Sequence, residues 1–304
     1  MLIKELLPKH RENNLTHDPE KLIFEGVAPK DVYNISSPFE FAGKTFILGR
    51  VESRDSEHSQ ACFFEAAGPA RYVLNLEAPS FQLQDPFYTF IEDQLVVGGV
   101  EVREKTSNPS EFEWRTVFYK GTDVTNLERF FEGPFGMKDL RIKGLNDGRI
   151  LVLTRPQGEK GGRGNIGAVL LDCLDQLTVT AVDEAPLLEG QFIDEEWGGA
   201  NEIHQLADDR LGVLGHIACF DEAGDRHYYA MTFELSLPDF AIRDVKLVAE
   251  RQDFLPGQAK RPDLEDVVFS GGILLNGQEA TLYAGISDAE AQKLDLVNPF
   301  VKGV

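Results

Sequence analysis

The chain has 304 residues with 51 acidic and 30 basic side chains, which gives a formal net charge of −21. We do not expect it to bind nucleic acid or an anionic membrane, because proteins that bind these polyanions present a basic surface. The three cysteines are too few and too scattered for a disulfide framework or a Cys/His metal site. The sequence has no signal-peptide core and no apolar run of about 18 residues, so we expect a cytoplasmic protein without a metal.

Five segments of the chain each combine two short apolar strands with a tight polar turn between them. They read FEFAGKTFILGR, YTFIEDQLVVGGVE, RIKGLNDGRILVLTR, EIHQLADDRLGVLGH and GGILLNGQEATLYAGIS. Successive turns are roughly 50 to 70 residues apart, the length of one four-stranded blade with its loops. The repeat predicts an all-β fold, a five-bladed β-propeller with a central polar active-site cavity.

The predicted blades follow one another along the chain, at residues 32–67, 87–120, 137–174, 198–237 and 266–296. Residues 1–30 mix charge with a short apolar pattern and are expected to supply a strand that helps close the ring, which removes exposed sheet edges. No interior stretch has the composition of a linker, so residues 1–304 are expected to form a single domain. The glycine-rich segment 155–165 is either a flexible hairpin loop or a loop that closes on an anion or a sugar.

A polar residue leaves the second strand of each pair, and in a radial array these positions converge near the axis. They are Arg50, Glu101, Arg155, His216 and Ser287-Asp288. Arg50, Arg155 and His216 are among them, and their positive charges would repel one another unless an anion lay between them. Lys138 offers a further point charge, and the arginine forks match phosphate oxygens. The alternative is that each arginine pairs with a nearby carboxylate, as Arg50 with Glu52.

A second polar set stands just before the first strands of the blades. It comprises Asn34, Asp85, Asn201, Glu202, Glu265 and Asp266. Asp85 precedes a proline that restricts the backbone and would direct the carboxyl group toward the axis, although an aspartate that caps a turn is the alternative. Polar groups of this kind can hydrogen-bond sugar hydroxyls. The aromatic side chains of Tyr33, Trp197 and Tyr228 can pack against the faces of sugar rings. The two sets together predict a ligand that combines carbohydrate with phosphate.

The order of these motifs resembles that of the β-mannoside phosphorylases of glycoside hydrolase family 130. It is more similar to the related β-1,2-mannosyltransferase/phosphorylases, glycosyltransferase family 108, formerly a domain of unknown function. The similarity covers nearly the whole chain, through LQDPFYTF, GMKDLRIKGLNDGRILVLTRPQG, WGGANEIHQLADDRLGVLGH and EDVVFSGG. One departure is the run Gln84-Asp85-Pro86-Phe87, where the first group commonly has E-D-P/A-R, and it affects the contacts expected with the distal sugar.

The resemblance implies a role for particular residues of this chain. Asp85, in the QDP motif, would be the general acid. Phosphate would be bound by Arg50, Lys138, Arg155, His216 and Tyr228 or Tyr229. The sugar would be bound by Asn34, Glu202, Asp266 and Asp288.

These roles predict reversible phosphorolysis of β-mannosides, β-1,2-linked manno-oligosaccharides above all, to α-mannose 1-phosphate with inversion. Inorganic phosphate is then a co-substrate and no cofactor is needed, since the protein supplies only an acid and cations. The partners expected are a manno-oligosaccharide and phosphate or mannose 1-phosphate, and the sequence says nothing about oligomeric state.

Three alternatives stay open at this point. One is mannosyl transfer from GDP-mannose. Another is inverting hydrolysis, which needs a second carboxylate about 6.5 to 9.5 Å from the acid, with Glu202 or Asp266 as candidates. The third is a propeller that binds carbohydrate without catalysis.

Overall fold

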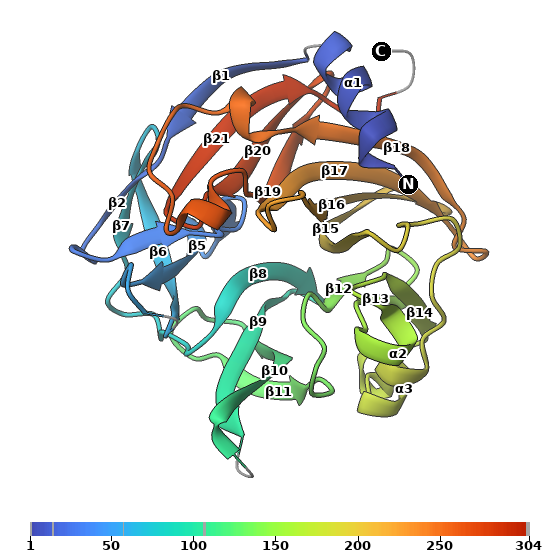
Figure 1. The fold of residues 1–304 in the computed structure, drawn as a ribbon. Helices are drawn as coiled ribbons and strands as arrows, with labels where there is room; N and C mark the ends of the chain where they lie inside the picture. The colour runs from blue at the N-terminus through green and yellow to red at the C-terminus, as the bar shows by residue number, and fades with distance from the viewer. Residues whose placement is uncertain (1, 14, 57, 106–107, 302–304) are drawn as a thin grey trace.

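Five β-sheets surround a central axis, as Figure 1 shows in a view along that axis. The computed structural model describes residues 2–13, 15–56, 58–105 and 108–301. Each sheet places one strand beside the axis and the others progressively farther out. The prediction of a five-bladed β-propeller is therefore confirmed.

The blades have the following strands within the described part of the chain. The first sheet, ordered β2-β7-β6-β5-β3 with β4 also paired to β5, contains β2 (Ile23–Glu25), β3 (Asp31–Tyr33), β4 (Phe39–Phe41), β5 (Lys44–Glu52), β6 (Gln60–Gly68) and β7 (Arg71–Leu74). The second contains β8 (Gln84–Ile91), β9 (Gln94–Lys105), β10 (Asn108–Gly121) and β11 (Glu128–Glu132). The third contains β12 (Arg141–Gly144), β13 (Ile150–Thr154) and β14 (Gly167–Leu171).

The fourth and fifth sheets complete the ring. The fourth contains β15 (Glu196–Ala207), β16 (Arg210–Phe220), β17 (Arg226–Ser236) and β18 (Ile242–Ala249). The fifth contains β19 (Val268–Asn276), β20 (Glu279–Ile286), β21 (Glu290–Val297) and β1 (Thr16–Lys21). The helical segments are α1 (Ile3–Asn13), α2 (Gly158–Gly161), α3 (Val179–Glu184) and the 3₁₀ turns η1 (Leu174–Gln176), η2 (Arg251–Asp253) and η3 (Pro262–Leu264).

The five predicted hairpins all occur, at the turns between β4 and β5, β8 and β9, β12 and β13, β15 and β16, and β19 and β20. In two of them both central residues have left-handed backbone, Ala42 (φ 51°) with Gly43 (φ 77°) and Glu92 (φ 49°) with Asp93 (φ 61°). Two-residue turns of this kind follow the right-handed twist of the flanking strands. The turn residues therefore support the strand pairing that the apolar pattern predicted.

The N-terminal strand closes the ring. β1 pairs with β21 from Thr16 opposite Leu296 to Lys21 opposite Gln292, so the two ends of the chain contribute to one sheet (Figure 1). The strand expected within residues 1–30 is therefore β1. Ahead of it, α1 places Leu6 and Leu7 against the core between the third and fourth blades, and this helix was not expected from the sequence.

Apolar side chains form a separate core cluster at each junction between neighbouring blades. Between the second and third blades, for example, Phe87 and Val96 pack with Ile142 and Val152. Because interiors of this kind are close-packed, the inner strands are held in fixed positions relative to one another. The side chains at the ends of these strands are therefore also held in fixed positions relative to one another.

Candidate active site

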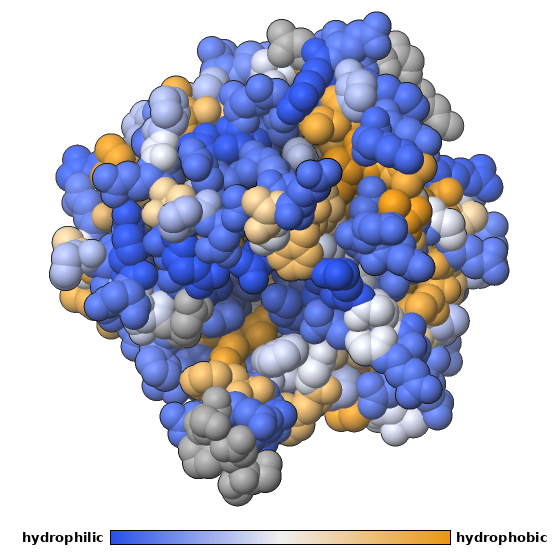
Figure 2. Space-filling model, in the orientation of Figure 1, coloured by the Kyte–Doolittle hydropathy of each residue, from blue (hydrophilic) through white to orange (hydrophobic). Residues whose placement is uncertain are grey.

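A cavity of about 270 Å³ lies at the centre of the propeller, close to the lower end of the range typical of small-molecule sites. It is lined by most of the residues that the sequence singled out: Asn34, Arg50, Asp85, Lys138, Arg155, His216, Tyr228 and Asp288. Figure 2 shows that hydrophilic residues surround much of the centre of this face. The radial array thus brings together groups from all five blades.

Asp85 enters the cavity from the start of β8. The pairing of β8 with β9 shifts register between Gln84 and Phe87, and Asp85 has left-handed backbone with φ 50°. Such a bulge redirects a side chain, and the missing N–H of Pro86 is tolerated there. The Oδ1 atom of Asp85 accepts hydrogen bonds from Asn34 Nδ2 at 2.7 Å and Arg50 Nη1 at 3.1 Å. The carboxylate is therefore held at the axis by two neighbouring groups.

Arg50 is paired with carboxylates, as the alternative interpretation of the sequence proposed. Its Nη2 donates to Glu52 Oε2 at 2.8 Å, while Nη1 reaches Asp85. Burial disfavours the charge of Arg50, but Asp85, Tyr33 and Glu52 together raise its pKa above the ordinary value. Burial likewise opposes the charge of Glu52, but Arg50 and hydrogen bonds from Lys260 and Ser59 lower its pKa to about 2. Arg50 is therefore a fixed cation that orients the carboxyl group of Asp85.

Arg155 has a different environment. Only 2% of the residue is exposed, and its Nε donates to the carbonyl oxygen of Gly198 at 2.6 Å. Asp139 Oδ2 lies 3.4 Å from the same Nε, and within the described residues Nη1 has no hydrogen-bond partner. A buried donor without a partner costs free energy, so its place in the cavity wall suits an anionic ligand.

The glycine-rich segment packs directly on this guanidinium. A Cβ atom added to Gly164 (φ 145°) would lie 2.5 Å from Arg155 Nη2, and one added to Gly199 would lie 2.9 Å from Arg155 Cδ. Two backbone segments without side chains therefore approach the arginine from different blades. Within segment 155–165, the backbone at Gly164 therefore packs against Arg155 and helps to position its guanidinium group.

His216 is fixed by a hydrogen bond and by two aromatic rings. Its Nδ1 lies 2.8 Å from Asn201 Oδ1, and the ring lies between Tyr228 (centroids 5.6 Å apart) and Phe269 (5.2 Å). Burial lowers the pKa of His216 to about 3, against the effect of nearby Asp139, so the ring is neutral at pH 7. A neutral ring that uses Nδ1–H toward Asn201 presents Nε2 as an acceptor.

Two of the predicted sugar-binding residues lie outside this cavity. Glu202 lines a separate cavity of about 300 Å³ and accepts a hydrogen bond from the backbone N–H of Ile273 at 2.6 Å. Asp266 lines an open groove and pairs with His227. Asn201, beside Glu202, is the residue of that strand that reaches His216, because the pairing of β15 with β16 shifts between Ala200 and Glu202.

The structure also distinguishes the two tyrosines and Glu101. Tyr228 lines the cavity and accepts a hydrogen bond from Trp197 Nε1 at 3.0 Å, whereas Tyr229 is buried in the apolar cluster between the third and fourth blades. Glu101 pairs with Arg115 and Arg129, away from the cavity. Strand alternation places neighbouring residues on opposite faces, so only one tyrosine reaches the site.

The sequence alone did not identify several residues of the cavity wall: Asp139, Arg226, Lys260, Arg261 and Phe269. Asp139 directly follows Lys138 in the sequence. Its position next to a predicted phosphate-binding residue was the signal that could have identified it as part of the cavity wall. Lys260 and Arg261 lie next to η3, outside the strand repeat, so no periodic pattern pointed to them.

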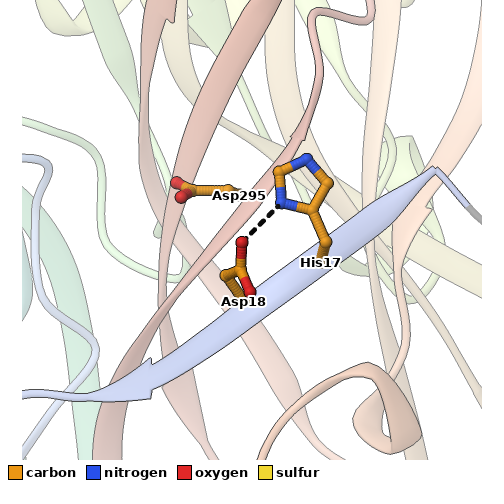
Figure 3. Close-up of side chains that lie close together, drawn as sticks. All are labelled: His17, Asp18 and Asp295. Carbon is orange, nitrogen blue, oxygen red and sulfur yellow. Dashed lines mark ion pairs between the residues drawn. The ribbon is translucent and has the colours of Figure 1, made fainter.

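One group with metal-like spacing occurs among the described residues, and it lies on the outer seam of the fifth blade. His17, Asp18 and Asp295 have ligand atoms within 4.8 Å of one another, on β1 and β21 (Figure 3). His17 and Asp18 are exposed and make an ion pair of 3.4 Å. Exposed acidic groups commonly cluster without a metal, so this group carries no assignment. No helix in the described chain is long and apolar enough to cross a membrane.

Solved structures similar to this chain include two proteins from Leishmania mexicana. A mannose phosphorylase, MPT-4, solved with a phosphate ion, is 33% identical over 98% of this chain and 93% of its own, with a TM-score of 0.90. A GDP-Man-dependent mannosyltransferase, MPT-1, is 28% identical over 99% and 96%, with a TM-score of 0.89. A β-1,2-mannobiose phosphorylase from Listeria innocua, 15% identical over 94% and 95%, shares the fold at a TM-score of 0.62.

These similarities confirm the predicted class, an enzyme that transfers glycosyl groups. The chain belongs to the family described as a protein of unknown function (DUF1861), whose model matches residues 9–302. The relationship to mannosyltransferases and phosphorylases inferred from the motifs is thereby confirmed as well. A comparison with curated protein sequences found no match.

Proposed function

We propose that this enzyme catalyses reversible phosphorolysis of β-mannosides and releases α-mannose 1-phosphate with inversion. The observation that carries the proposal is the buried guanidinium of Arg155, whose Nη1 faces no partner among the described residues, in a cavity shared with Lys138 and His216. The phosphate ion in the 33% identical mannose phosphorylase agrees with this chemistry.

In the proposed reaction Asp85 protonates the glycosidic oxygen. The C1–O bond breaks, the alcohol leaves with that proton, and a phosphate oxygen forms the new bond to C1 from the opposite face. Arg50 and Asn34 hold the Asp85 carboxyl group in place. Arg155, Lys138, His216 and Tyr228 bind phosphate, and Asn34 and Asp288 contact the sugar. No catalytic base is required, because phosphate is itself the nucleophile.

The positions of two carboxylates favour phosphate over water as the acceptor. Hydrolysis with inversion needs a base across the sugar from the acid. Glu202 and Asp266, the carboxylates considered for that role, lie outside the cavity that contains Asp85. The cations in the cavity wall instead match an anionic nucleophile.

The test is release of inorganic phosphate from α-mannose 1-phosphate with mannose or a manno-oligosaccharide as acceptor. We expect release by the wild type and a loss of about 100-fold or more in the Asp85→Asn variant, because a positioned general acid contributes about that much. Asp147→Asn, in the exposed turn before β13, is the matched control and should retain full activity.

A second mannosyl donor distinguishes phosphorolysis from the competing reaction, mannosyl transfer. The 28% identical relative is named as GDP-Man-dependent, so GDP-mannose is assayed in parallel. Turnover with GDP-mannose and none with mannose 1-phosphate would replace phosphorolysis by mannosyl transfer. Full activity of Asp85→Asn with either donor would remove Asp85 from the mechanism.

A further inference from the structure

The phosphate-binding end of the cavity contains a carboxylate that the reaction does not use. Asp139 lies directly after Lys138, is 2% exposed and has left-handed backbone with φ 57°. Its Oδ2 lies 3.4 Å from Arg155 Nε and 4.0 Å from His216 Nε2. Asp139 is therefore in the middle of the groups that would hold phosphate.

Asp139 stays ionised in this position. Burial opposes its charge, but Arg155, His216, Lys138 and Arg141 together lower its pKa to about 2. An ionised carboxylate only accepts hydrogen bonds. Among the described residues its Oδ1 has no hydrogen-bond partner, although the atom is buried. Such an acceptor is costly unless a ligand supplies a donor.

His216 provides a second acceptor at the same place. Its Nδ1 is hydrogen-bonded to Asn201, and its Nε2 faces Asp139. The anion site therefore combines donors, from Arg155 and Lys138, with two acceptors. A ligand that accepts from these donors and donates to one of the two acceptors must be an oxyanion that still carries a proton.

We propose that Asp139 is a specificity-determining residue that makes this site select protonated oxyanions, such as hydrogen phosphate, over fully deprotonated ones such as sulfate. Hydrogen phosphate donates its O–H to Asp139 or to His216 Nε2 while its other oxygens accept from the cations. Sulfate has no proton to donate near neutral pH, so its oxygens would face a carboxylate without a hydrogen bond. The inference rests on the phosphate site of the proposed function and adds its selectivity.

The experiment measures anion binding to the whole chain by calorimetry at pH 7.5, without sugar and at constant ionic strength. Phosphate is compared with sulfate, and arsenate with selenate, because each pair has similar size and differs in the retained proton. We expect phosphate and arsenate to bind at least about tenfold more tightly than their partners, the effect of one unsatisfied buried acceptor. Equal affinity within either pair would overturn the proposal, even if phosphorolysis is observed.

The variant Asp139→Asn tests the residue itself. Its amide can donate to an oxyanion, so sulfate should bind more tightly and the phosphate-to-sulfate preference should fall toward one. The matched control is Asp263→Asn, which removes a negative charge that pairs with Arg226 and Arg261 at the cavity rim. It should change both affinities by the same factor and leave their ratio unaltered.

Other results separate the two proposals. If the ratio of phosphate affinity to sulfate affinity were the same in Asp139→Asn as in the wild type, the proposed role of Asp139 would be overturned. A changed KM for the sugar with an unchanged anion ratio would assign this carboxylate to the sugar instead. If the variant does not fold, the wild-type comparison of the four anions still decides selectivity. Selective binding without any turnover would leave this inference standing and reject the proposed function.

Discussion

At the scale of single residues, burial and the neighbouring charges together decide the protonation state of the titratable groups in the cavity wall. The histidine at position 216 would be partly protonated near pH 6.5 in water. In the cavity wall its pKa falls to about 3, chiefly because of burial. Asp139 and Glu52 stay ionised with pKa values of about 2, because cations compensate their burial. The site thus holds a neutral acceptor and fixed carboxylates among its cations.

These shifts predict that stability without ligand decreases as the pH falls. The folded pKa of His216 lies below the unfolded value, so the unfolded chain binds more protons below about pH 6.5 and stability is lost as pH falls toward 3. From pH 7 to pH 5 this histidine alone should account for about 2 kcal/mol. The depressed pKa values of Asp139 and Glu52 add a further loss between about pH 4 and pH 2.

Urea unfolding at several pH values measures this effect. The variant His216→Asn should flatten the dependence between pH 7 and pH 5. The control His17→Asn removes a histidine on the outer seam of the fifth blade, so it tests whether loss of a histidine away from the cavity has the same effect. Parallel curves for His216→Asn and the wild type would show that His216 is not the group responsible.

At the scale of elements, irregularities of the backbone decide which side chains enter the cavity. The bulge before Phe87 directs Asp85 to the axis, and the shift at Ala200 turns Asn201 rather than Glu202 toward His216. The glycine-rich segment has a comparable role, since its backbone contacts Arg155 where any side chain would collide. Each device changes which side chain of a strand or loop enters the cavity.

The variant Gly164→Ala tests the element that holds Arg155. Its Cβ would approach Arg155 Nη2 to 2.5 Å, so the guanidinium must move and the KM for phosphate should rise by about tenfold or more. Gly162→Ala is the matched control, because Gly162 also has positive φ (59°) but its added Cβ meets nothing closer than 3.8 Å. Steady-state kinetics with varied phosphate gives the comparison. Equal effects of the two variants would mean that backbone strain, and not contact with Arg155, is responsible.

At the scale of the whole molecule, ring closure holds the five inner strands in register around the cavity. The pairing of β1 with β21 joins the two ends of the chain, and without it β21 would present an open edge. Deletion of residues 2–21 should lower the melting temperature by about 10 °C or more, or make the chain aggregate. Deletion of residues 2–13 removes α1 but keeps β1, and it should lower the melting temperature by a smaller amount. Thermal melts of the two truncations check this order, and equal melting temperatures would contradict it.

The sequence by itself determined the architecture and most of the candidate site. Alternation of apolar residues and the turn residues between them are local signals, so five hairpins and a propeller followed from them. The cavity residues Asp85, Arg155 and His216 followed from their repeated positions and from the family resemblance. The helical spacing of Ile3, Leu6 and Leu7 is present in the sequence too, but so short an apolar pattern does not distinguish a helix from a strand.

Only the tertiary structure decided which neighbouring side chains face the axis. It separated Tyr228 from Tyr229 and Asn201 from Glu202, placed Asp266 in a groove, and added Asp139 and Lys260 to the wall. The physical reason is that one irregularity in strand pairing exchanges the two faces of a strand. Such irregularities, and the packing of one blade on the next, depend on contacts between distant parts of the chain that no local pattern records.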